Sequence, residues 1–279
     1  MRVAVAGALG EVGRGVVAAL RSRGHDVVRL SSRAPIDGES DLLALTAPWS
    51  ADLLVNCAGR GDRRVSERTG RESLDRLADR CEKLGIRGVL LSTTRVMEGH
   101  DTDYEESVPV NPRTTYAQAN CEIEQLWLTG SKAHVLRITN FFGAPHAYDS
   151  PQSMLLPWSL VTEALETGKV DIRSGPGTFR EFVDSTDLVR ALEIVAAESD
   201  PPSVMATVPG TRFTLADLTG IVADAFVMCD RAVPSFTFGA DAVSAVRCRP
   251  GWLADQGWQG ELTAHHVTAV IAGWIRTHT

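Results

Sequence analysis

The stretch Gly7-Ala8-Leu9-Gly10-Glu11-Val12-Gly13 lies between a short apolar run, Arg2 to Ala6, and an amphipathic stretch, Val12 to Arg23. Glycines at this spacing, between a predicted strand and a predicted helix, allow a tight turn and a close approach of phosphate to the N–H groups of the helix. The alternative is a turn whose glycines serve only the backbone. We predict that the loop binds the pyrophosphate of a nicotinamide cofactor through Gly7, Leu9, Gly10, Glu11, Val12 and Gly13.

The end of the second predicted strand bears on which cofactor is bound. That strand runs from Asp26 to Leu30, and the following residues are Ser31, Ser32 and Arg33, without the carboxylate that holds the adenosine ribose of NAD. Hydroxyl groups and a guanidinium suit a 2′-phosphate, because arginine binds phosphate through two parallel hydrogen bonds. We predict NADP, with NAD as the alternative, and expect Ser31, Ser32 and Arg33 to contact it.

Strand and helix patterns alternate through the first half of the chain, which is typical of βαβ units and a parallel sheet. This predicts an α/β fold, a Rossmann doubly wound parallel sheet over residues 1–144. From Ala144 onwards prolines interrupt the pattern, and residues 145–279 are predicted to form a smaller C-terminal substrate-binding lobe, partly interleaved with the first domain. The remaining predicted strands are Asp52 to Cys57, Gly88 to Ser92 and Ala133 to Ile138, and the remaining helices are Arg71 to Leu84, Tyr116 to Leu128, Pro157 to Glu166, Leu188 to Ala197, Leu215 to Ala225 and His265 to Arg276.

The composition of the chain argues against several classes of binding partner and site. The chain has 279 residues, a net charge of −7 and a pI near 5.5, so it lacks the basic character of a nucleic-acid-binding surface. The five cysteines are scattered and form no C-x-x-C pair, and no histidine shows metal-ligand spacing, so we expect neither disulfides nor a metal. Without a leader or an apolar run of about 18 residues, we expect a cytoplasmic protein without membrane contact.

Several segments, taken in order, resemble the extended branch of the short-chain dehydrogenase/reductase superfamily, the NAD-dependent epimerase/dehydratase family. Its members include sugar-nucleotide epimerases, dehydratases and 4-ketoreductases, and the short stretch between strand two and Asp52 looks most like the dTDP-4-keto-6-deoxysugar reductases. The matching segments are the glycine loop, Asn56-Cys57-Ala58-Gly59, Leu91 to Val96, Tyr116 at the start of a helix, Arg137 to Gly143 and Phe179 to Asp184.

The resemblance implies roles for individual residues. Tyr116 would transfer the proton on oxygen, and Thr93 would hydrogen-bond the same oxygen, with Ser92 and Thr94 as alternatives. One of Glu105 and Glu106 would lie near the substrate. Cys57, Ala58 and Gly59 would line the cofactor, and the substrate would contact Thr94, Asn140 and Arg180, the last two at its nucleotide diphosphate. The alternative reading has Asn140 capping a turn and Arg180 paired with a surface carboxylate.

The chain departs from the family at the catalytic helix. The family pattern Y-x-x-x-K places a lysine one turn after the tyrosine, where this chain has Asn120. Loss of a unit charge at about 4 Å and an effective dielectric of about 20 removes up to about 4 kcal/mol of stabilisation from the developing tyrosinate. This predicts a slow enzyme, a cation supplied from elsewhere or a changed reaction. Arg95 is the candidate substitute cation, with a surface role as its alternative.

Together these features predict an NAD(P)-dependent oxidoreductase that acts on a keto or hydroxyl carbon of a sugar nucleotide, as a 4-ketoreductase or epimerase. The catalytic residues would be Tyr116, Thr93 and Asn120. The alternatives are a non-redox isomerase, lyase or cyclase on the same scaffold, and a regulatory cofactor-binding protein without turnover. The expected partner is the small-molecule substrate, and a homodimer is compatible with the sequence.

Overall fold

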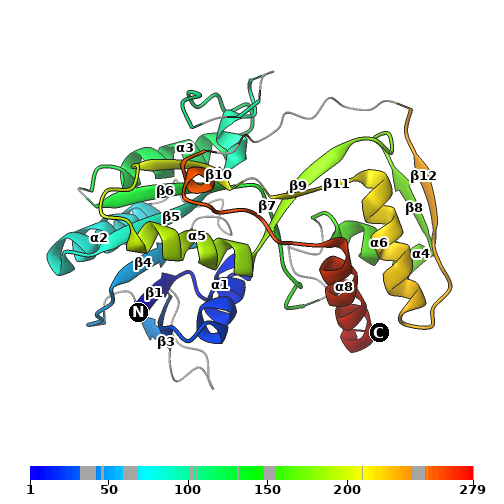
Figure 1. Ribbon diagram of the computed structural model, residues 1–279, viewed down its shortest axis with the longest axis horizontal. Coiled ribbons are helices and arrows are strands. Elements are labelled where there is room, and N and C mark those ends of the chain that lie inside the picture. Colours follow the sequence, from blue (N-terminus) through cyan, green and yellow to red (C-terminus); the bar gives the residue numbers. More distant parts are fainter. Residues whose placement is uncertain are drawn as a thin grey trace. The chain divides into compact units, whose positions relative to one another are not determined.

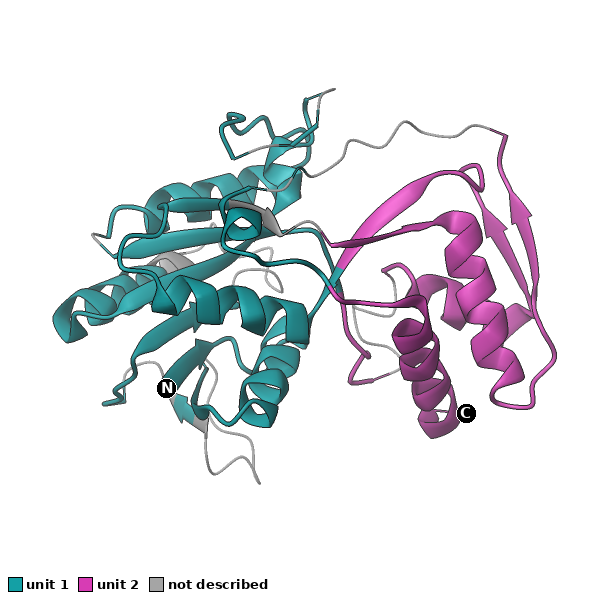
Figure 2. Cartoon of the chain, viewed as in Figure 1, with its two compact units in different colours: residues 1–141, 183–209, 246–260 teal, residues 142–182, 210–245, 261–279 magenta. Residues whose placement is uncertain are grey.

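The computed structural model describes residues 1–31, 42–44, 47–58, 68–100, 103–104, 106–130, 132–147, 155–208, 210–240, 249 and 251–278. The chain divides into two compact units, each assembled from separate segments (Figure 2). The first unit comprises residues 1–141, 183–209 and 246–260, and the second comprises residues 142–182, 210–245 and 261–279.

Within the described residues, seven strands form one parallel sheet in the first unit, in the order β10-β6-β5-β4-β1-β2-β3 (Figure 1). The chain leaves β1 towards β2 and β3 and then returns to β4 on the opposite side of β1. The predicted doubly wound parallel sheet is therefore confirmed. Its strands are β1 (Arg2–Ala6), β2 (Asp26–Ser31), β3 (Leu42–Ala44), β4 (Leu53–Asn56), β5 (Arg87–Thr93), β6 (Ala133–Ile138) and β10 (Val204–Val208).

Helices bury both faces of this sheet, which explains why its central strands are apolar throughout. Val3 and Val5 of β1 pack in the same hydrophobic cluster as residues of α1 and α5, whereas Ala4 and Ala6 pack in the cluster that contains Leu77 of α2. Alternate side chains of one strand thus support opposite layers. The helical elements of this unit are α1 (Glu11–Ser22), α2 (Arg68–Leu84), η1 (Thr94–Met97), α3 (Thr115–Trp127), α5 (Ser185–Ala197) and α7 (Trp252–Asp255).

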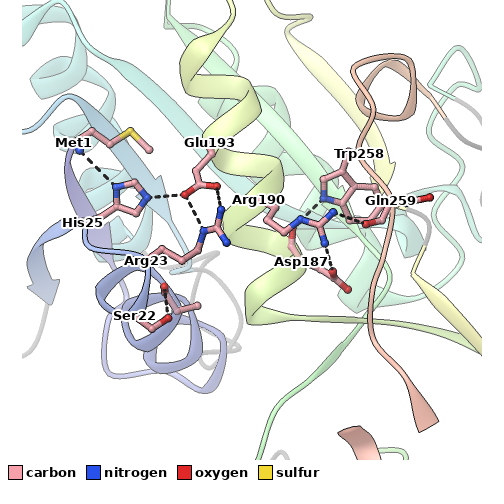
Figure 3. A network of polar contacts seen from close by, with 10 residues as sticks. Met1, Ser22, Arg23, His25, Asp187, Arg190, Glu193, Trp258 and Gln259 are labelled. Carbon is pink, nitrogen blue, oxygen red and sulfur yellow. Dashed lines mark hydrogen bonds and ion pairs between the residues drawn. The ribbon is translucent and has the colours of Figure 1, made fainter. Parts of the chain in front are cut away.

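Polar contacts join distant segments of the first unit at α5 (Figure 3). Glu193 accepts hydrogen bonds from Arg23, at 2.9 and 2.6 Å, and lies 2.7 Å from Nε2 of His25. Further along α5, the main-chain oxygen of Asp187 accepts a 3.0 Å hydrogen bond from the Trp258 indole. These contacts fix the end of α1, the start of β2 and the returning segment 251–260 to a single helix.

The second unit has its own core, built around the aromatic side chains of Phe142, Trp158, Phe182, Phe213 and Trp274. Its strands form two small sheets. In one, β9 runs antiparallel to β11 and also pairs with β7, and in the other β8 runs parallel to β12. Its elements are β7 (Asn140–Phe142), α4 (Trp158–Thr167), β8 (Lys169–Ile172), β9 (Phe179–Asp184), β11 (Thr211–Thr214), α6 (Leu215–Val227), β12 (Ser235–Phe238) and α8 (Ala264–His278), of which β7 and β9 each extend across a unit boundary. None of the described helices in either unit has the length and apolar character needed to cross a membrane.

Candidate active site

The glycine loop joins β1 to α1 in a conformation that side chains would prevent. Gly7 has a φ of 73°, and a Cβ atom there would lie 2.8 Å from the backbone nitrogen of Ala58. A Cβ atom at Gly13 would lie 2.1 Å from the carbonyl oxygen of Gly7. Separations this short force backbone atoms to move, so glycine is required at both positions for the loop, the first turn of α1 and the end of β4 to meet.

The residues of the loop fit the dinucleotide that the sequence predicts. Gly10 is the N-cap of α1 and provides no side-chain hydrogen bond to the first turn, which suits an external anion as the acceptor. The loop also lies at the carboxyl end of β1, beside the point where the sheet order reverses between β1 and β4. Open α/β sheets bind their ligands at this point. Glu11 places a carboxylate in the same first turn, where its negative charge would repel a bound phosphate.

The neighbouring strand ends were predicted to contribute cofactor contacts. Ser31 ends β2 and is buried, whereas Ser32, Arg33 and Gly59 lie outside the described residues. After β4, burial raises the pKa of the Cys57 thiol to about 12, so this cysteine stays protonated at neutral pH and is a poor nucleophile.

Asn56, the last residue of β4, has a structural role that the sequence reading missed. Its Oδ1 atom accepts a 2.9 Å hydrogen bond from the backbone nitrogen of Ala58 and so shapes the turn that contacts Gly7. The Asn56 side chain is fully buried, and no described residue hydrogen-bonds its Nδ2 atom. An asparagine at the end of a buried strand is the sequence signal that indicates such a turn.

Tyr116 lies in the first turn of α3, and the elements before it fix that turn. Thr114 is the N-cap, and its Oγ1 atom accepts a 3.2 Å hydrogen bond from the backbone nitrogen of Ala117. Thr93 ends β5 and caps η1, with its Oγ1 atom 3.3 Å from the backbone nitrogen of Arg95, while the side chain of Thr94 is buried. Since η1 packs against α3, the predicted catalytic tyrosine and the predicted serine/threonine site lie on adjoining elements.

Asn120 uses its side chain within the helix. Its Nδ2 atom donates a 2.8 Å hydrogen bond to the main-chain oxygen of Tyr116, and the residue is only 9% exposed. The position that carries lysine in the resembled pattern therefore holds a neutral amide, one of whose N–H groups is engaged by the backbone.

The next residue on this helical face, Glu124, forms a buried ion pair. Its carboxylate accepts hydrogen bonds from Arg137 at 2.8 to 3.2 Å and from the Ser92 hydroxyl at 2.5 Å. The side chains of Glu124 and Arg137 are 4% and 6% exposed. The sequence reading gave this pair no role, although an acid on the face of Tyr116 and Asn120 and an arginine within an apolar strand were its visible signals.

A second charged pair lies next to Tyr116. Arg95 places its guanidinium carbon 5.9 Å from the centroid of the tyrosine ring and pairs with Glu98 at 2.9 Å. The other oxygen of Glu98 accepts hydrogen bonds from the backbone nitrogens of Arg113 and Thr114, at 3.2 and 2.7 Å. Partial burial raises the pKa of Glu98, but the hydrogen bonds from Thr114 and Arg95 outweigh it and leave that pKa lowered. Glu98 is therefore ionised at neutral pH.

The acidic loop before Tyr116 was expected to place Glu105 or Glu106 near the substrate. Glu105 lies outside the described residues. Glu106 accepts a 3.0 Å hydrogen bond from the backbone nitrogen of Trp252, the first residue of α7, and Arg249 pairs with Asp103 at 3.2 Å. These contacts attach the loop to the returning segment of the first unit.

The predicted diphosphate ligands belong to different units. Asn140 is exposed at the start of β7, in the first unit. Arg180 lies in β9, in the second unit, and its guanidinium donates a 2.9 Å hydrogen bond to the main-chain oxygen of Phe179. Their roles, and that of Thr94, stay predictions. In the described part of the chain, no three His, Cys, Asp or Glu side chains gather as a metal site.

Comparison with solved structures supports the fold described above. MoeE5, solved with UDP-glucuronic acid and NAD, aligns with a TM-score of 0.72 and 21% identity over 99% of both chains. TunA, an NAD-dependent NDP-hexosamine 5,6-dehydratase, gives 0.75 and 19% over 100% of this chain and 99% of its own. Thermus thermophilus UDP-glucose 4-epimerase, solved with NAD, gives 0.72 and 18% over 100% of both chains.

Sequence comparison identifies the family. Among curated proteins, no sequence matches the chain. The family model described as "NAD dependent epimerase/dehydratase family" matches residues 3–206, which include the glycine loop, Tyr116 and the Glu124–Arg137 pair. This match confirms the resemblance noted in the sequence, and the chain belongs to the NAD-dependent epimerase/dehydratase family of enzymes.

Proposed function

We propose that the protein is an NAD(P)-dependent oxidoreductase that acts on a keto or hydroxyl carbon of a sugar nucleotide, as a 4-ketoreductase or an epimerase. The observation that carries the proposal is the common edge of the parallel sheet at which the two key elements lie. The glycine loop follows β1, and the Thr93 turn that packs against the Tyr116 helix follows β5. The same sheet edge thus positions both the loop that would bind the cofactor and the elements next to the Tyr116 helix.

The nicotinamide cofactor, when bound, gives a hydride to the substrate carbon or takes one from it. In the reducing direction the Tyr116 O–H bond breaks, its proton passes to the substrate oxygen, and the tyrosine is left as phenolate until solvent reprotonates it. Thr93 donates a hydrogen bond to the same substrate oxygen and holds it in place. In the oxidising direction the phenolate takes the proton back from the substrate hydroxyl.

The proposed substrate class is supported by the positive charge of Arg180 and by the sugar nucleotides named for the solved relatives. MoeE5 was solved with UDP-glucuronic acid, and the Thermus thermophilus relative is a UDP-glucose epimerase. Asn140 and Arg180 are the residues that we propose for the nucleotide diphosphate, because an arginine fork can pair with two phosphate oxygens. We further propose Thr94 as a substrate contact and residues 145–279 as contributing the sugar-nucleotide site.

The proposed cofactor preference is NADP over NAD. It is supported by Ser31 at the end of β2, together with the sequence of the two residues that follow, which provides hydroxyls and a guanidinium but no carboxylate. The preference is tested by titrating the protein separately with NADPH and with NADH and measuring the two dissociation constants from the fluorescence of the reduced cofactor. Equal affinities would contradict it.

Turnover is tested by following the absorbance of the reduced nicotinamide with a panel of 4-keto and 4-hydroxy sugar nucleotides, with product analysis by NMR to detect epimerisation. Tyr116→Phe is expected to reduce turnover by about 10²–10⁴-fold, the usual contribution of a positioned proton donor. Tyr104→Phe is the matched control and is expected to keep turnover. Unchanged turnover in Tyr116→Phe would show that another group moves the proton.

One observation favours a second candidate function. Asn120 provides no cation beside Tyr116 and turns its amide to the helix backbone. A scaffold that binds the cofactor without net redox turnover, as an isomerase, lyase or cyclase or as a regulatory protein, tolerates that arrangement. Tight cofactor binding with no change of nicotinamide absorbance across the panel would favour this candidate, and product analysis would separate a non-redox enzyme from a regulator.

A further inference from the structure

We infer that Arg95, held in place by Glu98, supplies the cation that stabilises the deprotonated form of Tyr116, from the η1 side of the ring and not from within α3. The inference rests on the proposed function, because it takes Tyr116 as the proton donor. Arg95 is thereby a positioning residue for the proton step, and the charge that this family pattern usually places one helical turn after the tyrosine comes from a different element.

The geometry places the cation against the ring. The guanidinium carbon lies 5.9 Å from the ring centroid of Tyr116, within the range at which a cation interacts with an aromatic face. Deprotonation adds electron density to the ring and oxygen, so the same cation attracts the phenolate more strongly than the phenol. The contact therefore favours the state that exists after the proton has moved.

Arg95 is held by contacts that also define the start of α3. Nε and Nη2 of Arg95 lie 3.0 and 2.9 Å from one oxygen of Glu98, and the other oxygen accepts from the backbone nitrogen of Thr114, the N-cap of α3. At its base, the backbone nitrogen of Arg95 hydrogen-bonds the Thr93 hydroxyl oxygen. One carboxylate thus ties the cation to the helix that carries the tyrosine.

The charged groups on other elements that pack against α3 have different contacts. The charge of Arg137 on β6 is neutralised within the core by Glu124, and Arg113, before α3, donates to the main-chain oxygen of Gly99. On α2, Arg80 donates to the main-chain oxygen of Trp49 and Lys83 pairs with Asp79 at 4.0 Å. The guanidinium of Arg95, by contrast, lies over the tyrosine ring.

Solvent limits the size of the effect. The Arg95 side chain is 56% exposed, and its Glu98 partner carries the opposite charge. A unit charge about 6 Å away, at an effective dielectric between about 20 and 80, changes an equilibrium constant by roughly 3- to 100-fold. We expect values near the lower end, because Glu98 offsets part of the field.

The first test does not depend on knowing the substrate. The chain has three tyrosines, Tyr104, Tyr116 and Tyr148, so subtracting the ultraviolet pH titration of Tyr116→Phe from that of the full-length wild type isolates Tyr116. In Arg95→Met, the tyrosinate absorbance assigned to Tyr116 is expected to appear at higher pH than in wild type. Arg95→Lys retains most of the effect. The matched control is Arg2→Met, which removes an exposed arginine paired with Asp26.

The second test is kinetic and uses Asn120→Lys as a background that restores a cation within the helix. In the natural chain, Arg95→Met is expected to lower kcat by roughly 3- to 100-fold. The rising, acidic limb of the pH profile for oxidation is expected to move to higher pH, because the phenolate is the base in that direction. In the Asn120→Lys background, Arg95→Met is expected to lower kcat by no more than about 2-fold, because the new lysine already stabilises the same phenolate. A purely structural role for Arg95 would cost the same in both backgrounds.

The outcomes separate this inference from the proposed function. An unchanged Tyr116 titration in Arg95→Met and in the shorter Arg95→Gln overturns the inference, whatever happens to turnover. An upward shift in the titration, with no turnover of any sugar nucleotide, supports the inference and counts against the proposed function. Circular dichroism of each variant at neutral pH checks that the fold is retained, and where Arg95→Met unfolds, Arg95→Gln decides the same question.

Discussion

The side-chain amide of Asn120 donates a 2.8 Å hydrogen bond to the main-chain oxygen of Tyr116, one turn earlier in α3. This bond shows how the chain accommodates the loss of the family's lysine. A long ammonium side chain would extend away from its own helix, whereas the short amide folds back and satisfies the backbone. Under the inference drawn above, the cation that acts on Tyr116 then comes from Arg95, outside α3.

Restoring the lysine should therefore raise activity. In Asn120→Lys, an ammonium group near Tyr116 favours its ionised form, and turnover in the proposed redox reaction is expected to rise at least 10-fold, with an upper limit of about 10³-fold from a charge about 4 Å away. Steady-state kinetics with the best substrate of the panel measure the change. Asn120→Ala removes the backbone hydrogen bond without adding charge, and an equal rise in that variant would show that charge is not the cause.

Substitution at Gly13 should disrupt the cofactor site. A Cβ atom there would lie 2.1 Å from the main-chain oxygen of Gly7, so the loop and the first turn of α1 must separate. Gly13→Ala is expected to lower stability by about 1–3 kcal/mol and to weaken cofactor binding at least 10-fold. Urea denaturation and fluorescence titration measure both. Gly220→Ala on α6 has nothing within 4 Å of the new Cβ atom and should gain up to about 1 kcal/mol.

Glu11 is predicted to affect stability and cofactor affinity in opposite directions. A carboxylate in the first turn of α1 stabilises the helix by about 0.3–1 kcal/mol through the helix dipole, but repels a phosphate at the same place. Glu11→Gln should therefore unfold slightly more easily and bind NADPH about 2- to 5-fold more tightly. The gain should shrink as salt is added. Glu122→Gln, at an exposed position on α3, should leave affinity unchanged, and equal gains in both variants would count against a local effect.

How much of the fold could be predicted differs along the chain. The strands β1 and β6 begin and end where the sequence predicts, because strands buried on both faces are continuous apolar runs between polar residues. The strand β10 was not predicted: it is short and follows Pro201-Pro202, and its place in the sheet depends on pairing with β6, about seventy residues earlier. Similarly, β9 carries Arg180 and Glu181, and its pairing with β11 and β7 makes it a strand.

The same distinction applies to the candidate site. Tyr116, Thr93 and the glycine loop could be proposed from the sequence, because each is a local pattern attached to a recognisable strand or helix end. The turn at Asn56 and the clamp that Glu98 makes between Arg95 and Thr114 could not, because they depend on hydrogen bonds between segments. A substitute cation at Arg95 was one alternative in the sequence, and its position over the Tyr116 ring requires the turn of η1.

The cluster at Glu193 predicts a pH dependence of stability. Hydrogen bonds from Arg23, opposed by partial burial and aided by His25, leave the pKa of Glu193 below its ordinary value of 4.5. A carboxyl whose pKa is lowered by folding stabilises the fold above that ordinary value, and the stabilisation is lost as the pH falls below it through the folded pKa. Glu193→Gln should therefore be less stable than wild type at neutral pH and approach it in acid.

Urea denaturation from about pH 7 down to about pH 3 measures this convergence. Asp255→Asn serves as a control, because Asp255 lies on α7 and is not among the groups that shift the pKa of Glu193. A difference in stability between Glu193→Gln and wild type that stays constant across the whole range would mean that the carboxylate charge is not what stabilises the junction of α1, β2 and α5.

The buried pair of Glu124 and Arg137 is predicted to be far more costly to break than to replace. Both side chains are almost fully excluded from solvent, and Ser92 supplies a further hydrogen bond to the carboxylate. Removing one partner leaves the other charge in a medium that solvates it poorly, so Glu124→Gln and Arg137→Met should each cost about 3–5 kcal/mol. Replacing both, as Glu124→Leu with Arg137→Met, removes both charges and should recover much of that loss.

The exposed pair of Lys83 and Asp79 provides the contrast. Their side chains are 72% and 70% exposed, and Lys83→Met should change stability by less than about 1 kcal/mol. If the single variants at the buried pair cost as little as Lys83→Met, water must reach Glu124 and Arg137. In that case the Arg137 charge would not be confined to its partner, and it would compete with Arg95 as the cation acting on Tyr116. A large single-variant cost with recovery in the double variant keeps the two charged pairs separate, one structural and one directed at the tyrosine.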